Sequence, residues 1–534
     1  METRVKEDKS EAILNSQFLN WNACTNYDLA TNGRIWVLWR KGIDFTIIQI
    51  SDQCITIKGS SLGSPVFISA IYGSNDGSAR MRLWQTIREV DHIVNQSPWT
   101  LGVDFNIFLH SEESSDHELL GNYVTPDMKD FQDLSQDIDI MDHPYFGPTF
   151  TWSNKQQEFF LARKLDRVMI NSTWASYFPH SFVEFLSPSI FDHCMATMWL
   201  SKDSPINRPK PFKFFNFWAA HSNFLNVVRH SWLPTIHGNP MTTLITKLKR
   251  LKITLKSFNK DNFSNISDRV KLKRLELEQQ QILTLKGEES IVKEIGLQED
   301  LILLEEAEAE FLKQKAKVQC IRDGDKNSKF FHSIVASKNK RNIIRVLVDD
   351  SGCILESFDS MSQEVLSFYS NMLGSADASL KEVDPNLLKE LIDYSLPSEA
   401  STNFIRDITD EEIHNAIFCQ GNDKAPGPDG FTPLFFKKTW PIFGRDIIAA
   451  VRYFFSHIFI NPAFNSTIIA LVPKIPNPST VKDFRPISRC SVIYKAISKI
   501  LVSRLNFYIP DIVSLNQSTF IRGKSIMDNT FLTQ

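Results

Sequence analysis

The pattern of apolar residues changes near residue 200, and this change restricts the fold more than any other feature of the sequence. Residues 35–73 alternate short runs rich in β-branched and aromatic residues with turns, a pattern typical of an antiparallel meander. A helical pattern at 80–94 and further strand-like runs follow. Strands mixed with a few helices up to about residue 200 predict a layered α/β domain.

A helical pattern replaces the strand pattern after a proline-containing junction at 201–240. Apolar residues then recur at spacings of four and three, which predicts a buried helical seam made of Leu244, Leu248, Leu251, Leu255 and Phe258. Residues 241–280 carry ten Lys/Arg against four Asp/Glu, whereas 288–310 is strongly acidic. We interpret these stretches as a basic and an acidic helix folded back on each other. A charged spacer with a solvated face is favoured over a dedicated binding element.

The chain of 534 residues is too long for one hydrophobic core, so roughly two to four domains are expected. Helical patterns dominate from about residue 401 onward. The predicted parts are an α/β domain at 1–200, a junction at 201–240, a helical linker at 241–320, a connecting segment at 321–400 and a mainly helical region at 401–534.

Composition narrows the class of protein. A formal net charge of −3 gives no basic field over the whole chain, so any contact with nucleic acid must come from local patches. The seven cysteines form no C-x-x-C pair, which favours reduced thiols in an intracellular compartment and no zinc site. No run approaches the roughly 20 apolar residues of a membrane span. The charged start is not a secretory signal, and we expect no membrane partner.

Several polar residues lie at the ends of strand-like runs in the first 200 residues. They are Tyr72, Asp104, Asn106, Asp166, Asp192 and His193. In a strand, side chains two residues apart point the same way, so Asp104 and Asn106 are expected to face one pocket. Carboxylates for Mg²⁺ and a histidine for protons are what phosphodiester hydrolysis needs. Taken singly, however, each of these residues is more often structural than catalytic. An Asp-x-Asn sequence can be a plain turn, and a lone Asp-His pair usually has a structural role.

The order of these motifs resembles the endonuclease/exonuclease/phosphatase family, in its plant retrotransposon branch. The resemblance covers residues 1–200 and is carried by "GRIWVLW", "LGVDFN", "TFTWSN" and "KLDRVMIN". The family resemblance implies that Asp104 activates or orients the attacking water, with Asn106 beside it. It also implies that Tyr72 contacts the phosphate.

The same resemblance implies a magnesium site. The start "METRVKE" is similar to an "ETRVK" element of the branch, which gives Glu2 the role of a metal ligand. Asp192 would help to hold the metal or its waters. His193 would stabilise charge on the phosphorane-like transition state, and Asp166 would hold His193 in the required tautomer, as oriented metal-site histidines generally require.

The sequence departs from the family pattern in three ways. It has no strand and helix before the glutamate, Phe191 stands where the branch has serine, and Val103 replaces glycine. The resemblance therefore predicts a β-sandwich of this family that lacks its first strand. It further predicts that endonuclease activity is absent or weak.

A second group of motifs begins with "KAPGPDGF" at 424–431. Together with "LVPK", "DFRPIS" and "LNQSTFIRGK", it resembles the start of the reverse transcriptase domain in LINE-type, non-LTR retrotransposons. The resemblance implies that Lys474 and Arg485 meet the phosphates of the incoming nucleotide. The same resemblance implies that Gln517 and Arg522 lie near the template strand. Asp429 is expected to cap the turn.

Polymerase activity is predicted to be absent, because no Tyr/Phe-x-Asp-Asp turn occurs in the sequence to supply the metal-binding aspartates. The favoured interpretation is a LINE-type retrotransposon protein truncated at both ends, with DNA and RNA as partners. Its family role places it in the nucleus. The alternatives are a non-catalytic nucleic-acid-binding protein, which uses the basic stretch at 241–280, and an unselected genomic remnant.

Overall fold

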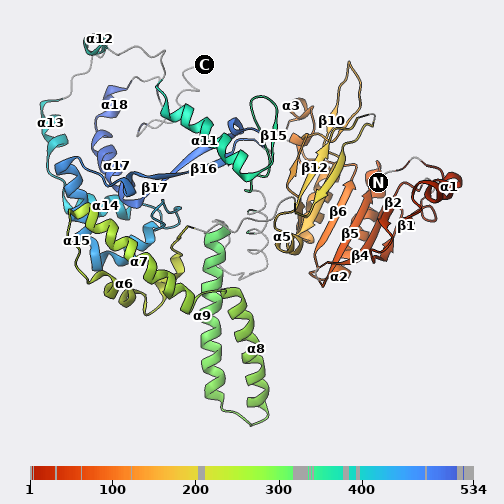
Figure 1. Ribbon diagram of the computed structural model, residues 1–534, viewed down its shortest axis with the longest axis horizontal. Helices are drawn as coiled ribbons and strands as arrows, with labels where there is room; N and C mark the ends of the chain where they lie inside the picture. The colour runs from red at the N-terminus through yellow and green to blue at the C-terminus, as the bar shows by residue number, and fades with distance from the viewer. Residues whose placement is uncertain are drawn as a thin grey trace. The chain divides into compact units, whose positions relative to one another are not determined.

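The computed structural model describes residues 3, 5–30, 33–61, 63–121, 123–189, 191–201, 211–316, 335, 338, 342–376, 384–391, 397–475, 478–513, 517 and 521 (Figure 1). The chain divides into two compact units. The first unit comprises Met1–Asn207, Asn327–Val365 and Pro473–Phe484. The second unit comprises Arg208–Lys326, Leu366–Val472 and Arg485–Gln534.

Short strands and a few helices make up the described chain before residue 207. In chain order they are α1 (Glu7–Gln17), β1 (Trp21–Thr25), β2 (Trp36–Arg40), β3 (Thr46–Ile50), β4 (Cys54–Ser61), β5 (Ser64–Tyr72), α2 (Gly77–Val94), β6 (Trp99–Asp104), the 3-10 helix Ser111–Glu113, α3 (His117–Leu120), α4 (Pro126–Asp137), β7 (Ile140–Asp142), β8 (Tyr145–Phe146), β9 (Trp152–Ser153), β10 (Ala162–Arg163), β11 (Asp166–Asn171), α5 (Ser172–Tyr177), β12 (Phe182–Leu186) and β13 (Met195–Trp199).

A six-stranded sheet in the order β3-β4-β5-β6-β11-β7 forms the centre of the first unit. Strands β5 and β6 run parallel, and the other neighbours run antiparallel. Smaller sheets are formed by β13-β12-β8, by β1-β2 and by β10-β9. The parallel β5–β6 pair requires a crossover, which α2 supplies. Both strands therefore end at the same edge of the sheet.

Helices α2 and α4 enclose the main core of the first unit. Asp76 caps α2 by accepting a hydrogen bond from Ser78, and Thr125 caps α4 with Pro126 at its first position. The buried faces of both helices stack aromatic rings, with Trp84 and Phe131 centroids 4.9 Å apart.

The described chain after residue 207 is mainly helical. In chain order its elements are the 3-10 helix Asn216–Ala220, α6 (Phe224–Trp232), α7 (Pro240–Asn262), α8 (Ile266–Leu285), α9 (Ile291–Ala316), β14 (Leu347–Val348), β15 (Ile354–Leu355), α11 (Phe358–Gly374), α12 (Pro385–Leu391), α13 (Ser398–Ile405), α14 (Asp410–Phe418), α15 (Pro433–His457), α16 (Pro462–Asn465), β16 (Thr467–Pro473), the 3-10 helix Val481–Asp483, β17 (Phe484–Cys490), α17 (Val492–Leu505) and α18 (Ile509–Ile512).

The second unit has its own hydrophobic core, to which α6, α7, α14, α15 and α17 contribute. The predicted seam of α7 is confirmed, because all five of its apolar residues are buried there: Leu244, Leu248, Leu251, Leu255 and Phe258. A sheet-rich α/β region followed by a mainly helical region confirms the predicted fold class. The borders of the five predicted parts stay predictions.

The basic stretch 241–280 is not one helix, and this corrects the expected pairing. The chain leaves the α7 helix after Asn262 and restarts at Ile266, with Asn265 in the left-handed region at φ 52°. Most of the basic residues of the stretch lie on α7, whose seam is buried in the core. The helical hairpin consists instead of α8 and the acidic α9, joined by Arg274–Glu305 at 2.5 Å.

The corner "KAPGPDGF" packs tightly within the second unit. A Cβ at Gly427 would lie 2.6 Å from the carbonyl carbon of Cys490, so only glycine fits against the end of β17. Gly430 has φ +78° and donates to the carbonyl of Gly427 at 3.0 Å. Neither carboxylate oxygen of Asp429 has a hydrogen-bond partner of normal geometry among the described residues, but the backbone N–H groups of Phe431 and Asp429 act on this carboxyl group and lower its pKa. Its role as a cap of the turn stays a prediction.

Within the part of the chain that the structure describes, no helix is both long and apolar enough to cross a membrane.

Candidate active site

Three of the predicted residues lie side by side at one edge of the six-stranded sheet. Tyr72 ends β5, Asp104 ends β6 and Asp166 begins β11. The strand register places Tyr72 opposite Asp104, and Asp104 opposite Asp166. Paired residues on neighbouring strands project to the same face of a sheet. Both carboxylates are buried, with 5% and 3% of Asp104 and Asp166 exposed.

His193 joins this group from the segment before β13. Its Nδ1 lies 2.9 Å and 3.1 Å from the two carboxylate oxygens of Asp166. A backbone bridge to Trp152 fixes the segment, and Thr151 accepts a hydrogen bond from the backbone N–H of Asp166. The predicted pairing of Asp166 with His193 is therefore present in the structure.

The negative charges around His193 favour its protonated form. Burial opposes a charge on the ring, but the hydrogen bond and charge of Asp166, with the charges of Asp104 and Asp192, raise the pKa of His193 to about 9. Each of Asp104, Asp166 and His193 has one potential metal-ligand atom, and these three atoms lie within 4.8 Å of one another. This convergence is the main feature of the site.

Asn106 holds the carboxylate of Asp104. Strand β6 ends at Asp104, and Asn106 lies in the following turn with φ 52°, so the two residues do not share a strand as expected. They nevertheless meet, because the backbone and side-chain nitrogens of Asn106 donate to Asp104 at 2.9 Å and 3.2 Å. The same amide donates to the carbonyl of Gly73 at 2.8 Å. Asn106 thus ties the end of β6 to the residue after Tyr72.

Arg34 is a neighbour of Tyr72 that the sequence did not indicate. Its Nη1 donates to the phenol oxygen of Tyr72 at 3.0 Å, and its guanidinium lies 5.3 Å from the ring centroid. The carbonyl of Arg34 accepts from the backbone of Thr3 at 2.9 Å, so the described N-terminal residue is anchored beside this pair. One arginine before an apolar run gives no distinctive signal in a sequence.

Buried polar side chains brace the loops that carry the site. Arg80, 4% exposed, donates to the carbonyls of Ser74 at 2.6 Å and Asn106 at 3.3 Å. It also pairs with Asp127 at 2.6 Å. Gln53 accepts from the backbone of Ser74 at 2.8 Å. Arg80 therefore links the loops that follow β5 and β6 to helix α4.

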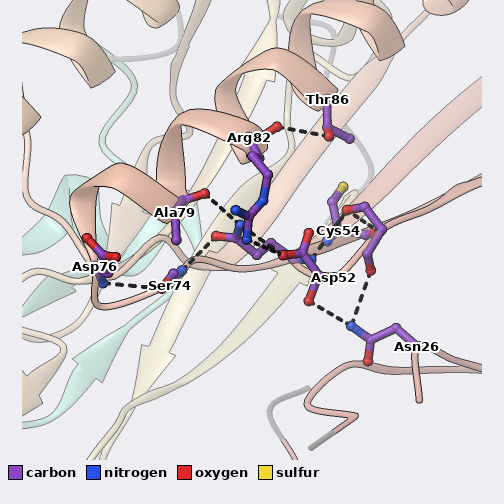
Figure 2. Close-up of polar contacts among 10 residues, drawn as sticks. Asn26, Asp52, Cys54, Ser74, Asp76, Ala79, Arg82 and Thr86 are labelled. Carbon is purple, nitrogen blue, oxygen red and sulfur yellow. Dashed lines mark hydrogen bonds and ion pairs between the residues drawn. The ribbon is translucent and has the colours of Figure 1, made fainter. Parts of the chain in front are cut away.

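The turn between β3 and β4 belongs to the same polar network (Figure 2). Asn26 donates to the carbonyl of Asp52 at 2.9 Å, and Arg82 pairs with the Asp52 carboxylate at 3.1 Å. Gln53, beside Asp52, donates to the carbonyl of Ala79 at 3.0 Å. Sequence reasoning missed these residues, because most of their partners are backbone groups distant in the chain.

The two predicted metal ligands have different outcomes. Glu2 lies outside the described residues. Asp192 is half-buried and close enough to His193 to act on its charge, but it is not one of the three residues whose donor atoms converge. Carboxylate oxygens are the ligands that Mg²⁺ prefers. Asp104 and Asp166 therefore offer suitable chemistry, and the role of Asp192 stays a prediction.

The residues predicted to contact nucleotide or template stay untested. Lys474 is exposed, and its ammonium donates to the carbonyl of Lys482 at 2.6 Å. Arg485 lies exposed on β17. Lys474 belongs to the first unit and Arg485 to the second. Gln517 is described, whereas Arg522 lies outside the described residues.

No protein-family model matches the chain. One curated protein, the transposon TX1 uncharacterized 149 kDa protein of Xenopus laevis, is 24% identical over 485 residues. The aligned region covers 86% of this chain and 36% of that protein, so the chain spans about a third of its relative's length.

Three of the solved structures that match the chain share 10% or 11% sequence identity with it. The endonuclease domain of TRAS1, a telomere-specific non-LTR retrotransposon, has a TM-score of 0.27, with 34% of this chain and 79% of that domain covered. An endonuclease/exonuclease/phosphatase family protein from Bacteroides thetaiotaomicron has a TM-score of 0.25, with 36% and 78% covered. The TDP2 of D. rerio, complexed with a single-strand DNA product, has a TM-score of 0.23, with 36% and 80% covered. By its sequence, the chain is homologous to a transposon protein.

Proposed function

We propose that the first unit is a magnesium-dependent phosphodiesterase that nicks DNA. The observation that carries this proposal is the convergence of Asp104, Asp166 and His193, each of which has a potential ligand atom within 4.8 Å of the others. Two buried carboxylates beside a histidine are costly to maintain unless they serve a charged partner or a reaction. The motif order and the homology to a transposon protein support a nucleic-acid substrate.

The chemistry of the donor set fits a hard divalent cation. Glu2 and Asp192 are the ligands that the family resemblance implies, and their carboxylate oxygens are of the kind that Mg²⁺ prefers. A bound magnesium ion would neutralise phosphate charge and lower the pKa of a water molecule. Turnover is therefore expected to depend on added metal and to stop with EDTA.

The residues of the chain have separate tasks in this proposal. Asp166 accepts the Nδ1–H of His193, which leaves Nε2 as the atom that faces the substrate. Protonated His193 stabilises the negative charge that develops on the phosphate oxygens. Asp104, held by Asn106, orients the attacking water and accepts its proton. Tyr72, with Arg34 donating to its oxygen, contacts the phosphate.

Exposed aromatic side chains beside the site favour a nucleic-acid substrate over a small phosphate ester. The loop between β9 and β10 carries Phe159 and Phe160, of which 77% and 61% are exposed. Its base is bridged to His193 through Trp152. Aromatic rings at such a position are suited to stacking on bases.

A plasmid-nicking assay tests the proposal. Supercoiled plasmid incubated with the full chain and Mg²⁺ should be converted to the nicked form, and EDTA should prevent conversion. The variant His193→Ala should be slower by about 100-fold or more. The exposed His180→Ala serves as the matched control and should match the wild type. Absence of metal-dependent nicking would instead support the earlier expectation of an inactive endonuclease.

We infer from the motif series "KAPGPDGF" to "FIRGK" that residues 401–534 correspond to the beginning of a reverse transcriptase domain. Homology to a transposon protein along most of the chain supports this inference. The sequence has no Tyr/Phe-x-Asp-Asp turn, so this chain is expected not to extend a primer. Primer extension on an RNA template by the purified chain would contradict this expectation.

A further inference from the structure

One face of α7 carries a row of lysines. Lys249, Lys252, Lys256 and Lys260 follow at spacings of three and four, which places them on one side of the helix. The apolar seam of the same helix is buried in the core of the second unit. Lys249, Lys256 and Lys260 are exposed, and Lys252 is half-buried. The row extends over about 16 Å of helix.

Lys252 is held in a defined position beside the "KAPGPDGF" corner. Its ammonium lies 5.8 Å and 5.9 Å from the ring centroids of Phe212 and Phe431. Burial lowers the pKa of Lys252, and Asp429 of the corner opposes this change. The charges of its neighbours on the helix lower the pKa further. The row of lysines therefore meets the corner at Asp429.

The corner and its neighbours contribute further cations. Burial lowers the pKa of Lys495 on α17, the charge of Asp429 opposes this change, and Arg489 and Lys424 add to the lowering. Arg489 donates to the carbonyl of Pro426 at 2.8 Å, which fixes it to the corner. Lys424 is exposed at the start of the corner. Lys252 of α7 and Lys495 of α17 therefore both interact with Asp429, and the other cations act on one of these two lysines.

Asp429 does not neutralise this cluster. Only 3% of the residue is exposed, and its carboxylate forms no hydrogen bond with a described residue. None of the surrounding cations forms an ion pair in the described part of the chain: Lys249, Lys252, Lys256, Lys424, Arg489 and Lys495. Two of these six cations, Lys252 and Lys495, act on the buried carboxyl group of Asp429, and the other four act on one of these two lysines. Such a concentration of charge in a chain of net charge −3 is a local field that attracts polyanions.

We propose that these six residues, here named the α7 patch, bind the phosphate backbone of a nucleic acid. Lysine provides compact point charges without a preferred base edge, so binding should be independent of sequence. Each phosphate contact releases condensed counterions, and affinity should therefore fall steeply with salt. The inference does not depend on hydrolysis at the candidate active site.

A pair of matched double variants of the full chain tests the α7 patch. Lys249→Gln with Lys256→Gln removes two exposed lysines of the patch. Lys271→Gln with Lys286→Gln is the control. Lys271 lies on α8 and Lys286 directly follows it, and both are exposed lysines of the second unit. The control therefore changes the net charge of the chain by the same amount as the patch variant. Fluorescence anisotropy with labelled single-stranded RNA, single-stranded DNA and duplex DNA is measured in EDTA over a series of salt concentrations.

The patch variant should bind several-fold more weakly than the wild type, with a slope of log affinity against log salt reduced by about 1.4 to 1.8. The α8 variant should match the wild type. The three oligonucleotides then show whether the patch prefers RNA or DNA. Equal affinities and slopes for both variants would overturn the proposal, as would a wild-type chain that does not bind nucleic acid at low salt. Circular dichroism melts of both variants exclude a folding defect.

Discussion

At the scale of single residues, the buried carboxyl groups of the two units have different hydrogen-bond partners. Asp166 holds a ring nitrogen of His193, and Asp104 is held by Asn106, so each carboxylate in the first unit has a defined partner. Asp429 in the second unit is buried without a hydrogen bond among the described residues. Burial without such a partner disfavours the charged form of a carboxyl group.

The first prediction concerns Asp429 and pH. Burial, opposed by the charge of Lys252, raises the pKa of Asp429 from 3.8 to about 6. The folded state then binds a proton more tightly than the unfolded state, so stability is lost as pH rises from about 4 to about 6. In the wild type this loss of unfolding free energy amounts to about 3 kcal/mol at most. The variant Asp429→Asn has no carboxyl group at this position, so its unfolding free energy should not show the loss.

Urea unfolding at a series of pH values measures this effect. The difference between Asp429→Asn and the wild type should grow from pH 4 to pH 6 and then stay constant. The exposed Asp511→Asn is the control and should show no such growth. A difference independent of pH would show that Asp429 has an ordinary pKa.

The sequence identified the residues that face the site better than the residues that support them. Tyr72, Asp104, Asp166 and His193 lie in or beside strand-like runs in a recognisable order, and the strand register brings the first three together. Arg80 could not be predicted, because its contacts are backbone carbonyls and an aspartate distant in the chain. Such contacts follow from the packing of α2 and α4 and have no local signature.

At the scale of elements, helix breaks and tightly packed glycines determine where helices end and how they pack. The periodicity of apolar residues did not predict these features. The 3.6-residue pattern correctly marked the buried seam of α7 as far as Phe258, but the helix expected from the basic charge of residues 241–280 ran across the break at Asn265. Asparagine is one of the few residues that adopt the left-handed conformation, but a single asparagine between two helical patterns does not by itself mark a break. The partner of α9 is consequently α8 and not the basic helix α7.

The second prediction tests the corner "KAPGPDGF". Gly427→Ala places a methyl group 2.6 Å from the carbonyl carbon of Cys490, and neither backbone segment can yield easily. The variant should lose about 1 to 3 kcal/mol of unfolding free energy, as overpacked sites do. Gly421→Ala is the matched control, because its Cβ would meet only the flexible side chain of Lys424 at 3.4 Å. Chemical denaturation compares the two, and equal stability would contradict the packing described.

At the scale of the whole molecule, each of the two units has a large hydrophobic core of its own among the described residues. Trp84, Trp99 and Phe131 lie in the core of the first unit, whereas Phe435 and Phe436 lie in that of the second. Sequence length and the change of pattern near residue 200 predicted more than one core. They did not predict that segments beyond residue 326 return to the first unit. Such returns depend on contacts between distant segments, which periodicity does not record.

The third prediction follows from the separate cores. Differential scanning calorimetry of the full chain should show two transitions. Phe131→Ala should lower the melting temperature of one, and Phe435→Ala that of the other, since each removes a fully buried ring at a cost of about 3 to 5 kcal/mol. A single transition that both variants shift equally would show that the units unfold together.

The most direct test of the account is a double-mutant cycle on plasmid nicking with Asp166→Asn and His193→Ala. If Asp166 acts by orienting His193, Asp166→Asn should slow nicking by about 10- to 100-fold. The double variant should be no slower than His193→Ala alone. Effects that multiply, or a wild-type chain without magnesium-dependent nicking, would contradict the claim that these residues form one hydrolytic site.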